Sequence, residues 1–177
     1  MGTQLMFCLE TNEQTKSDYI YIRSTIDHFF KMNQANIKIS PVYMNGKYNY
    51  NSLKVKKKIE ELTKQYRVTS NTNKSVVILC VDCDDYDIKN EDKIFMENAE
   101  AFCRNNEYRL VWFCKDIEQV FLHERVRDNE KRKRSEDFRR KGLITQIDRK
   151  SLEAGAYQIY RSNLGSVLAE FMKSNLS

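Results

Sequence analysis

Acidic residues stand at the ends of two apolar segments, where they could hold a metal ion. Glu10 closes the segment TQLMFCL, and Asp82 and Asp84 follow the segment SVVILCV. Alternate residues of an extended chain point to the same side, so we expect Asp82 and Asp84 to share a face. Carboxylates gathered in this way repel each other, and a hard cation that prefers oxygen ligands removes the repulsion. The pattern predicts a Mg²⁺ or Mn²⁺ site formed by Glu10, Asp82 and Asp84, although each acid taken singly is better explained as a helix cap or a loop residue.

The elements that must position these acids alternate along the chain. Apolar runs typical of buried strands cover residues 3–10, 37–46, 75–82 and 108–114. Between them lie amphipathic segments with apolar residues at helical spacing, the first capped by Ser17 or Asp18 and the second by Ser52. This order predicts a three-layer α/β/α, Rossmann-like fold with a mainly parallel, four-stranded sheet. Pro41 marks its strand as an edge or an irregular strand, and the Asn-Gly pair at 45–46 predicts a turn that closes it.

The rest of the chain is read as a helical extension of the same domain. We expect one domain over residues 1–177, with a core at about 4–115 and a helical, basic extension at about 116–177. Residues 116–134 and 162–175 are the predicted helices of the extension. In a parallel sheet, sites form at the carboxyl ends of the strands, so Glu10 joins the two aspartates if the first and third strands are neighbours.

The basic residues gather in the extension. The net charge is +5 and the isoelectric point about 8.9, which permits a nucleic-acid partner without requiring one. A solvated helix face is an equally good explanation of the basic run, because Glu130, Glu136 and Asp137 interrupt it. The predicted phosphate contacts are Arg125, Arg127, Lys131, Arg132, Lys133 and Arg134.

Cysteine usage and hydropathy indicate in which cellular compartment the protein works and whether it enters a membrane. The five cysteines are an odd number in apolar surroundings, which indicates reduced packing residues in a cytoplasmic protein. Cys80 and Cys83 have the spacing of a zinc pair, but no second pair follows and the chain has two histidines, so zinc is disfavoured. No run of about 18 apolar residues predicts a membrane span, and the N-terminus does not read as a signal peptide. We therefore expect no membrane partner, and a homo-oligomer stays open.

Three segments resemble a known family. CLETNEQTKSDYIY, VDCDDYD and CKDIEQVFLH are similar to the motifs of TOPRIM domains, and within that superfamily to those of RloB-like proteins of bacterial antiphage loci. The resemblance covers about residues 4–125. It implies that Glu10 acts as general acid/base or metal ligand and that Asp82 and Asp84 bind Mg²⁺. The family usually places glycine after the glutamate, where this chain has Thr11.

The resemblance adds two residues of the last segment to the catalytic candidates. Glu118 and His123 match a late motif in which a glutamate and a histidine lie on an apolar helix. A histidine that titrates near neutral pH could move protons or contact phosphate. The two residues are five apart, so a regular helix does not stack them, and His123 can equally be a surface residue at a helix end.

These features lead to a main hypothesis and two rivals. The main one is a Mg²⁺- or Mn²⁺-dependent nuclease that cleaves DNA or RNA in bacterial antiphage defence. The second is a non-catalytic, metal-binding regulatory subunit that works with a partner ATPase. Thr11 in place of the usual glycine favours this second hypothesis. A receiver-type phospho-acceptor domain ranks last, because Glu10 lacks a paired acid directly beside it and Lys115 matches only in part. A topoisomerase or primase would need further domains for which the chain has no room.

Overall fold

The centre of the molecule is a sheet of four parallel strands. A computed structural model of the chain describes residues 1–33 and 36–175. The strands lie in the order β3-β1-β4-β5, and the short β6 adds to β5 in the antiparallel direction. The strands of the sheet are β1 (Thr3–Leu9), β3 (Ile37–Tyr43), β4 (Lys74–Asp82), β5 (Arg109–Cys114) and β6 (Arg161–Ser162).

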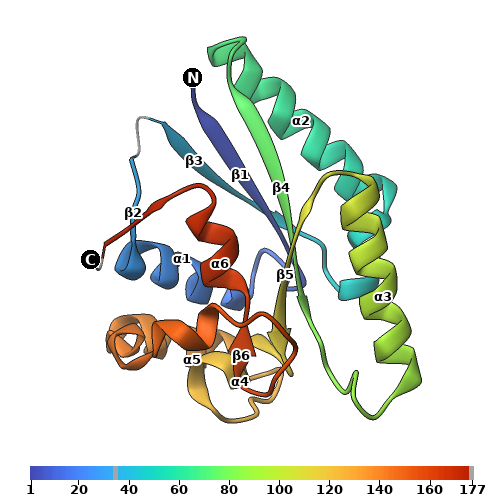
Figure 1. Cartoon of the computed structure of the whole chain (residues 1–177), viewed down its shortest axis with the longest axis vertical. Coiled ribbons are helices and arrows are strands. Elements are labelled where there is room, and N and C mark those ends of the chain that lie inside the picture. The colour runs from blue at the N-terminus through green and yellow to red at the C-terminus, as the bar shows by residue number, and fades with distance from the viewer. Residues whose placement is uncertain (34–35, 176–177) are drawn as a thin grey trace.

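Helices cover both faces of this sheet (Figure 1). On one face lie α2 (Leu53–Thr69) and α3 (Asn90–Asn105). On the other lie α1 (Ser17–Phe29), α4 (Ile117–Leu122), α5 (Lys131–Arg140) and α6 (Leu164–Ala169). The prediction of an α/β fold with a mainly parallel sheet between helices is therefore confirmed. The remaining short elements are β2 (Phe30–Lys31), β7 (Lys173–Ser174), and the 3₁₀ turns η1 (Lys47–Asn51), η2 (Leu143–Gln146) and η3 (Arg149–Leu152).

Alternation along the central strands divides the core into two halves. On β1, Leu5 and Phe7 face α1, while Met6 and Cys8 face α2 and α3, and all four are almost fully buried. Strands buried on both faces read as continuous apolar runs, which explains why their positions could be predicted. The five cysteines are buried and form no disulfide.

The starts of two helices show one correct and one wrong prediction. Ser52 caps α2, because its hydroxyl accepts a hydrogen bond from the backbone N–H of Val55 at 3.3 Å. At α1 the N-cap position is Lys16, in a left-handed conformation and without a side-chain cap. Asp18 does not cap the helix. Its carboxylate accepts from the backbone N–H of Thr11 at 3.2 Å, and so ties the loop after β1 to the first turn of α1.

The sheet has one strand more than predicted. Strand β6 has two residues and therefore leaves no periodic signal in the sequence. Beside it, the Asn163 side chain continues the pairing with β5: it accepts from the Trp112 N–H and donates to the Leu110 carbonyl, both at 2.9 Å. At the opposite side, β3 is the outermost strand, so the prediction that Pro41 marks an edge is confirmed.

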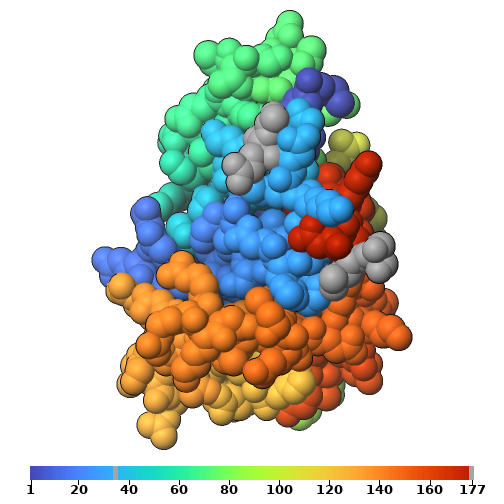
Figure 2. Space-filling model, turned by 90° about the vertical axis from the view of Figure 1, so that its left-hand side faces the viewer, coloured from blue at the N-terminus to red at the C-terminus, as the bar shows by residue number. Residues whose placement is uncertain are grey.

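The segment after β5 is not one helix over residues 116–134. Helix α4 ends at Leu122, and His123 follows with a φ of 56° in the left-handed region. The chain resumes a helix at Lys131, where α5 begins. Helix α5 lies against α1 (Figure 2), and its buried Phe138 ring contacts the Tyr21 ring of α1 at 5.0 Å. The last helix is also shorter than predicted, at Leu164–Ala169. No helix in the described part of the chain is long and apolar enough to cross a membrane.

Candidate functional site

The strand order creates a switch point between β1 and β4. From β1 the chain moves outward to β3, and then returns across the sheet to β4 and onward to β5. Crevices at the carboxyl ends of strands beside such a switch point are the usual ligand sites of open α/β sheets. Glu10 directly follows β1 and Asp82 ends β4, so these two acids flank the switch point. The first and third of the strands expected from the sequence, β1 and β4, are neighbours, which was the condition for Glu10 to join the aspartates.

Glu10 is joined directly to the end of β4. Its Oε1 accepts a hydrogen bond from the backbone N–H of Asp82 at 2.7 Å. Its backbone carbonyl accepts from the N–H of Gly46 at 2.8 Å, and Asn45 and Gly46 both have positive φ, as the predicted Asn-Gly turn requires. Thr11 does not lie in the left-handed region, so this backbone does not need the glycine that the resembled family has there.

Asp82 reaches to the other side of the crevice. Its Oδ1 accepts from the backbone N–H of Ile117, the first residue of α4, at 3.0 Å. Glu10 and Asp82 thus each use one carboxylate oxygen on a backbone amide. Their second oxygens, Oε2 and Oδ2, accept no hydrogen bond from the described residues.

Burial, together with neighbouring negative charges, raises the pKa of both Glu10 and Asp82. Burial raises the pKa of Glu10 to about 8, against the hydrogen bond from the Asp82 amide, with Asp18 and Asp84 adding to the rise. Burial also raises the pKa of Asp82 well above its ordinary value, and Glu10 and Asp18 add to the effect. Asp18, 7% exposed, likewise has a pKa raised by burial. Lys47 lowers the pKa of Glu10 but does not offset the rise.

Asp84 is not part of the strand that carries Asp82, contrary to the prediction that strand alternation places the two on one face. Strand β4 ends at Asp82, and Asp84 has a φ of 49°, so the alternation of an extended chain does not reach it. Its Oδ2 pairs with the Lys47 ammonium at 2.5 Å, and the same ammonium pairs with Asp92 at 2.8 Å. Asp85, which follows, pairs with Lys115 at 3.2 Å.

Lys47 and Asp92 are site residues that the sequence analysis missed. The Lys47 side chain is 12% exposed; burial lowers its pKa, but the hydrogen bonds to Asp84 and Asp92 outweigh this and leave the pKa raised. Lys47 follows the Asn-Gly turn, and Asp92 stands in the first turn of α3 where acids are common. Neither position carries a signal that points to Asp84. Asp18 was missed as a site residue as well, because it was read as a helix cap.

Of the two late candidates, the structure brings Glu118 to the site and leaves His123 outside it. Glu118 is 1% exposed, and neither of its carboxylate oxygens has a hydrogen-bond partner among the described residues. The Lys131 ammonium lies 3.5 Å from Oε2. Burial raises the pKa of Glu118 to about 7 against this cation. His123 is exposed and stacks on the Tyr160 ring at 5.0 Å.

The basic candidates divide in the same way. Arg125 lines a cavity of about 420 Å³ together with Asp84, Asp85 and Lys115, so it lies at the site. Arg127 is exposed in the loop before α5. On α5, several cations are already paired with acids. The pairs are Lys131 with Glu118 and Asp128, Arg132 with Glu136, Arg134 with Glu124, and Arg140 with Asp137.

The donor set fits a hard divalent cation, although its members are not yet gathered. Within residues 1–33 and 36–175, no three side chains of ligand type already stand as a metal site. Glu10 and Asp82 each offer one oxygen free of protein hydrogen bonds, and carboxylate oxygen is the ligand that Mg²⁺ prefers. The third predicted ligand, Asp84, is paired with Lys47 instead.

Comparisons with known proteins supply no relative for this chain. None of the protein-family models, the curated proteins or the solved structures with which it was compared matches it.

Proposed function

We propose that this protein is a metal-dependent nuclease of the TOPRIM, RloB-like kind that acts in the cytoplasm in bacterial defence. The observation that carries the proposal is the pair Glu10 and Asp82. Both follow neighbouring strands at the switch point, both have raised pKa values, and each keeps one oxygen free. Carboxylates that lack a counter-charge at a sheet edge suit a Mg²⁺ or Mn²⁺ ion and the phosphate bound to it.

The residues would divide the work of phosphodiester cleavage. Asp82 and Asp84 would hold the ion, which supplies charge neutralisation for the scissile phosphate. Glu10, with a pKa raised to about 8, is suited to carry a proton at Oε2 and give it to the leaving oxygen, or to take one from the attacking water. Lys47 would keep its pair with Asp92 once Asp84 binds the ion, and could direct another of its N–H groups to a phosphate oxygen. Glu118 would support the site through its charge rather than by contact.

Two conservative variants test this reading. Glu10→Gln keeps an oxygen that can accept from the Asp82 amide and removes the titrating charge; Asp82→Asn does the same toward Ile117. Asp87→Asn is the matched control, because Asp87 is an exposed acid in the same loop. Each protein is incubated with plasmid DNA, single-stranded DNA and total tRNA, in Mg²⁺, Mn²⁺ or EDTA. We expect cleavage that needs the metal, survives in Asp87→Asn and is lost in the other two.

Calorimetric titration with Mn²⁺ provides a second readout. Because Glu10, with a pKa of about 8, holds a proton at neutral pH, metal binding should release protons. Titrations in two buffers of different ionisation enthalpy measure the number of protons released. Binding and proton release should disappear in Asp82→Asn. Absence of both binding and cleavage in the wild type contradicts the proposal.

Metal binding without cleavage would instead favour the second candidate, a regulatory subunit that acts with a partner ATPase. The observation in its favour is the tight engagement of Asp84 by Lys47, which keeps one of the three carboxylates from the metal.

A further inference from the structure

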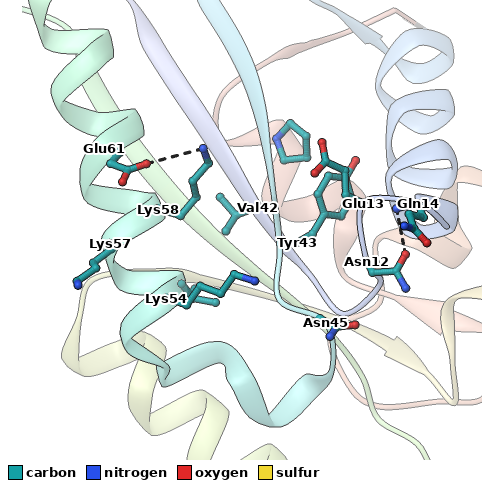
Figure 3. A pocket seen from close by; sticks show the side chains of 12 residues that line it. Asn12, Glu13, Gln14, Val42, Tyr43, Asn45, Lys54, Lys57, Lys58 and Glu61 are labelled. Atoms are coloured by element: carbon teal, nitrogen blue, oxygen red, sulfur yellow. Dashed lines mark hydrogen bonds and ion pairs between the residues drawn. The ribbon is translucent and has the colours of Figure 1, made fainter.

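A groove of about 900 Å³ opens beside the candidate site, between α2 and the loop that follows Glu10 (Figure 3). We call it the α2 groove. Its floor is largely apolar and comes from the edge strand: Pro41, Val42 and Tyr43. Its far wall carries the neutral amide side chains of Asn12 and Gln14. This combination offers a surface for flat, partly apolar groups next to hydrogen-bonding groups.

The near wall of the groove is basic. Lys54, Lys57 and Lys58 stand at spacings of three and one on α2, so they lie along one side of the helix. Figure 3 shows Lys54 extending across the groove toward Asn45, whereas Lys57 points outward. Among the lysines that line the groove, only Lys58 has an ion pair in the described chain, with Glu61 at 3.9 Å, and both partners are more than half exposed.

Two acids moderate this charge without cancelling it. Glu13 on the loop and Glu61 on α2 also line the groove, against three lysines. An exposed ion pair at 3.9 Å holds its partners weakly. Lys54 and Lys57 therefore remain available for an anion from solution.

The groove is continuous with the edge of the sheet where the acids lie. Its far wall begins at Asn12, two residues after Glu10, and Asn45 adjoins Gly46, whose N–H is bonded to the Glu10 carbonyl. A cluster of carboxylates repels a polyanion, so a polyanionic substrate needs cations nearby to hold it. The α2 groove places such cations one loop away from the acids.

We propose that the α2 groove binds one strand of single-stranded nucleic acid, with phosphates against Lys54, Lys57 and Lys58 and a base against the Tyr43 ring. Grooves of this kind combine cations that follow the backbone with aromatic rings on which bases stack. A duplex keeps its bases stacked inside and would leave the apolar floor uncovered. The inference deepens the proposed function, on which it rests for the adjacent chemistry, and it moves the main phosphate contacts from α5 to α2.

The test measures binding without catalysis. A short fluorescein-labelled oligothymidylate is titrated with protein in EDTA, and fluorescence anisotropy is followed between about 50 and about 200 mM salt. Lys54→Ala/Lys58→Ala removes two cations of the groove. Lys133→Ala/Arg139→Ala is the matched control, because it removes two exposed α5 cations that have no ion pair among the described residues.

We expect the groove variant to bind about tenfold more weakly, with a salt slope lower by about 1.4, since each lost phosphate contact to a single strand removes about 0.7. The control should change affinity less than about twofold. Equal losses in both variants, or a loss in the α5 variant alone, would overturn the assignment. So would a wild type that does not bind the oligonucleotide.

The Tyr43 contact is tested separately. Tyr43→Leu should weaken single-strand binding about fivefold or more, and Tyr43→Phe should restore it, because base stacking needs the ring and not the hydroxyl. A hairpin duplex of the same length should bind more weakly than the single strand and be indifferent to Tyr43→Leu. A duplex that binds better would contradict the inference. Since no metal is present, these results stand whether or not the protein cleaves, and binding without cleavage would count against the proposed function alone.

Discussion

Helices α2 and α5 have the same formal charge and use it differently. Each carries six cationic and two acidic residues, a net charge of +4. On α5, four of the six cations form ion pairs with acids of the described chain, and one of these acids, Glu118, is fully buried. On α2, one of six does so. The sequence composition alone would rank the two helices as equal candidates for nucleic acid.

The comparison shows that the charge a helix offers to a ligand depends on the acidic residues that neighbouring segments bring to it. The loop before α5 and the first turn of α4 bring acids to its cations, and Phe138 anchors the helix on α1. The cations of α2 line the outer faces of a helix whose inner face is Val55, Ile59 and Tyr66. Most cations of α5 are therefore engaged in ion pairs, while the cations of α2 remain exposed to solvent.

The largest expected effect comes from breaking the buried pair of α5. Lys131→Met leaves the Glu118 carboxylate buried without its cation. We expect this to lower the free energy of unfolding by about 3 kcal/mol near pH 8, because an uncompensated buried charge is costly. Urea unfolding followed by circular dichroism measures it. Near pH 5 the loss should shrink, since Glu118 can then hold a proton.

Lys133→Met is the matched control for that measurement. Lys133 lies on the same helix, is exposed and has no ion pair in the described chain, so its loss should stay within about 0.5 kcal/mol. If both variants unfold alike, α5 does not depend on Lys131 and the contrast with α2 fails.

The pH dependence of stability sharpens the contrast next. The pKa of Glu118 is about 7 in the folded chain against an ordinary 4.5, so the folded state binds this proton more tightly. The stability gained is fully present below about pH 4.5 and is lost as the pH rises to about 7, by about 3 kcal/mol at most. Glu118→Gln has no such proton, so its stability should fall less over this window. Denaturation curves between pH 4.5 and 7 compare the two proteins.

Glu10 acts in the same direction, with a pKa of about 8, and therefore leaves some slope in the variant. The difference between the wild-type and Glu118→Gln curves isolates Glu118. Parallel curves would show that Glu118 keeps its ordinary pKa in the fold.

The smallest expected effects come from removing one exposed cation from each helix. Arg132→Ala removes an exposed pair with Glu136 at 3.0 Å and should cost about 0.3–0.5 kcal/mol. Lys57→Ala, on α2, should leave stability unchanged while it weakens oligonucleotide binding. Thermal melts measure the stability of both variants, and the anisotropy assay measures their affinity for the oligonucleotide. A stability loss in Lys57→Ala larger than that in Arg132→Ala would reverse the comparison.

The features that the sequence predicted are those with local causes. Continuous apolar runs predicted the four parallel strands. Ser52 was correctly predicted to cap α2, and the Asn-Gly pair to form a turn. Such features need no knowledge of distant neighbours. The meeting of Glu10 and Asp82 does need it, and the sequence analysis expected it only if the first and third strands are neighbours, as β1 and β4 are.

The features that the sequence could not predict depend on contacts between distant segments. Lys47 meets Asp84 across 37 positions, and the positive φ of Asp84 interrupts the alternation of the strand that ends at Asp82. The break at His123 is invisible to periodicity, because apolar residues on both sides of it are compatible with helix. The two residues of β6 are too few to carry a pattern.

The two outer borders of the sheet bear on how the protein behaves at high concentration. At one border, the Asn163 amide occupies the free N–H and C=O of β5 as a neighbouring strand would. At the other, Pro41 interrupts the row of donors along β3. A strand from a second molecule therefore meets an occupied edge at β5 and an interrupted row of donors at β3, which disfavours edge-to-edge aggregation at high protein concentration.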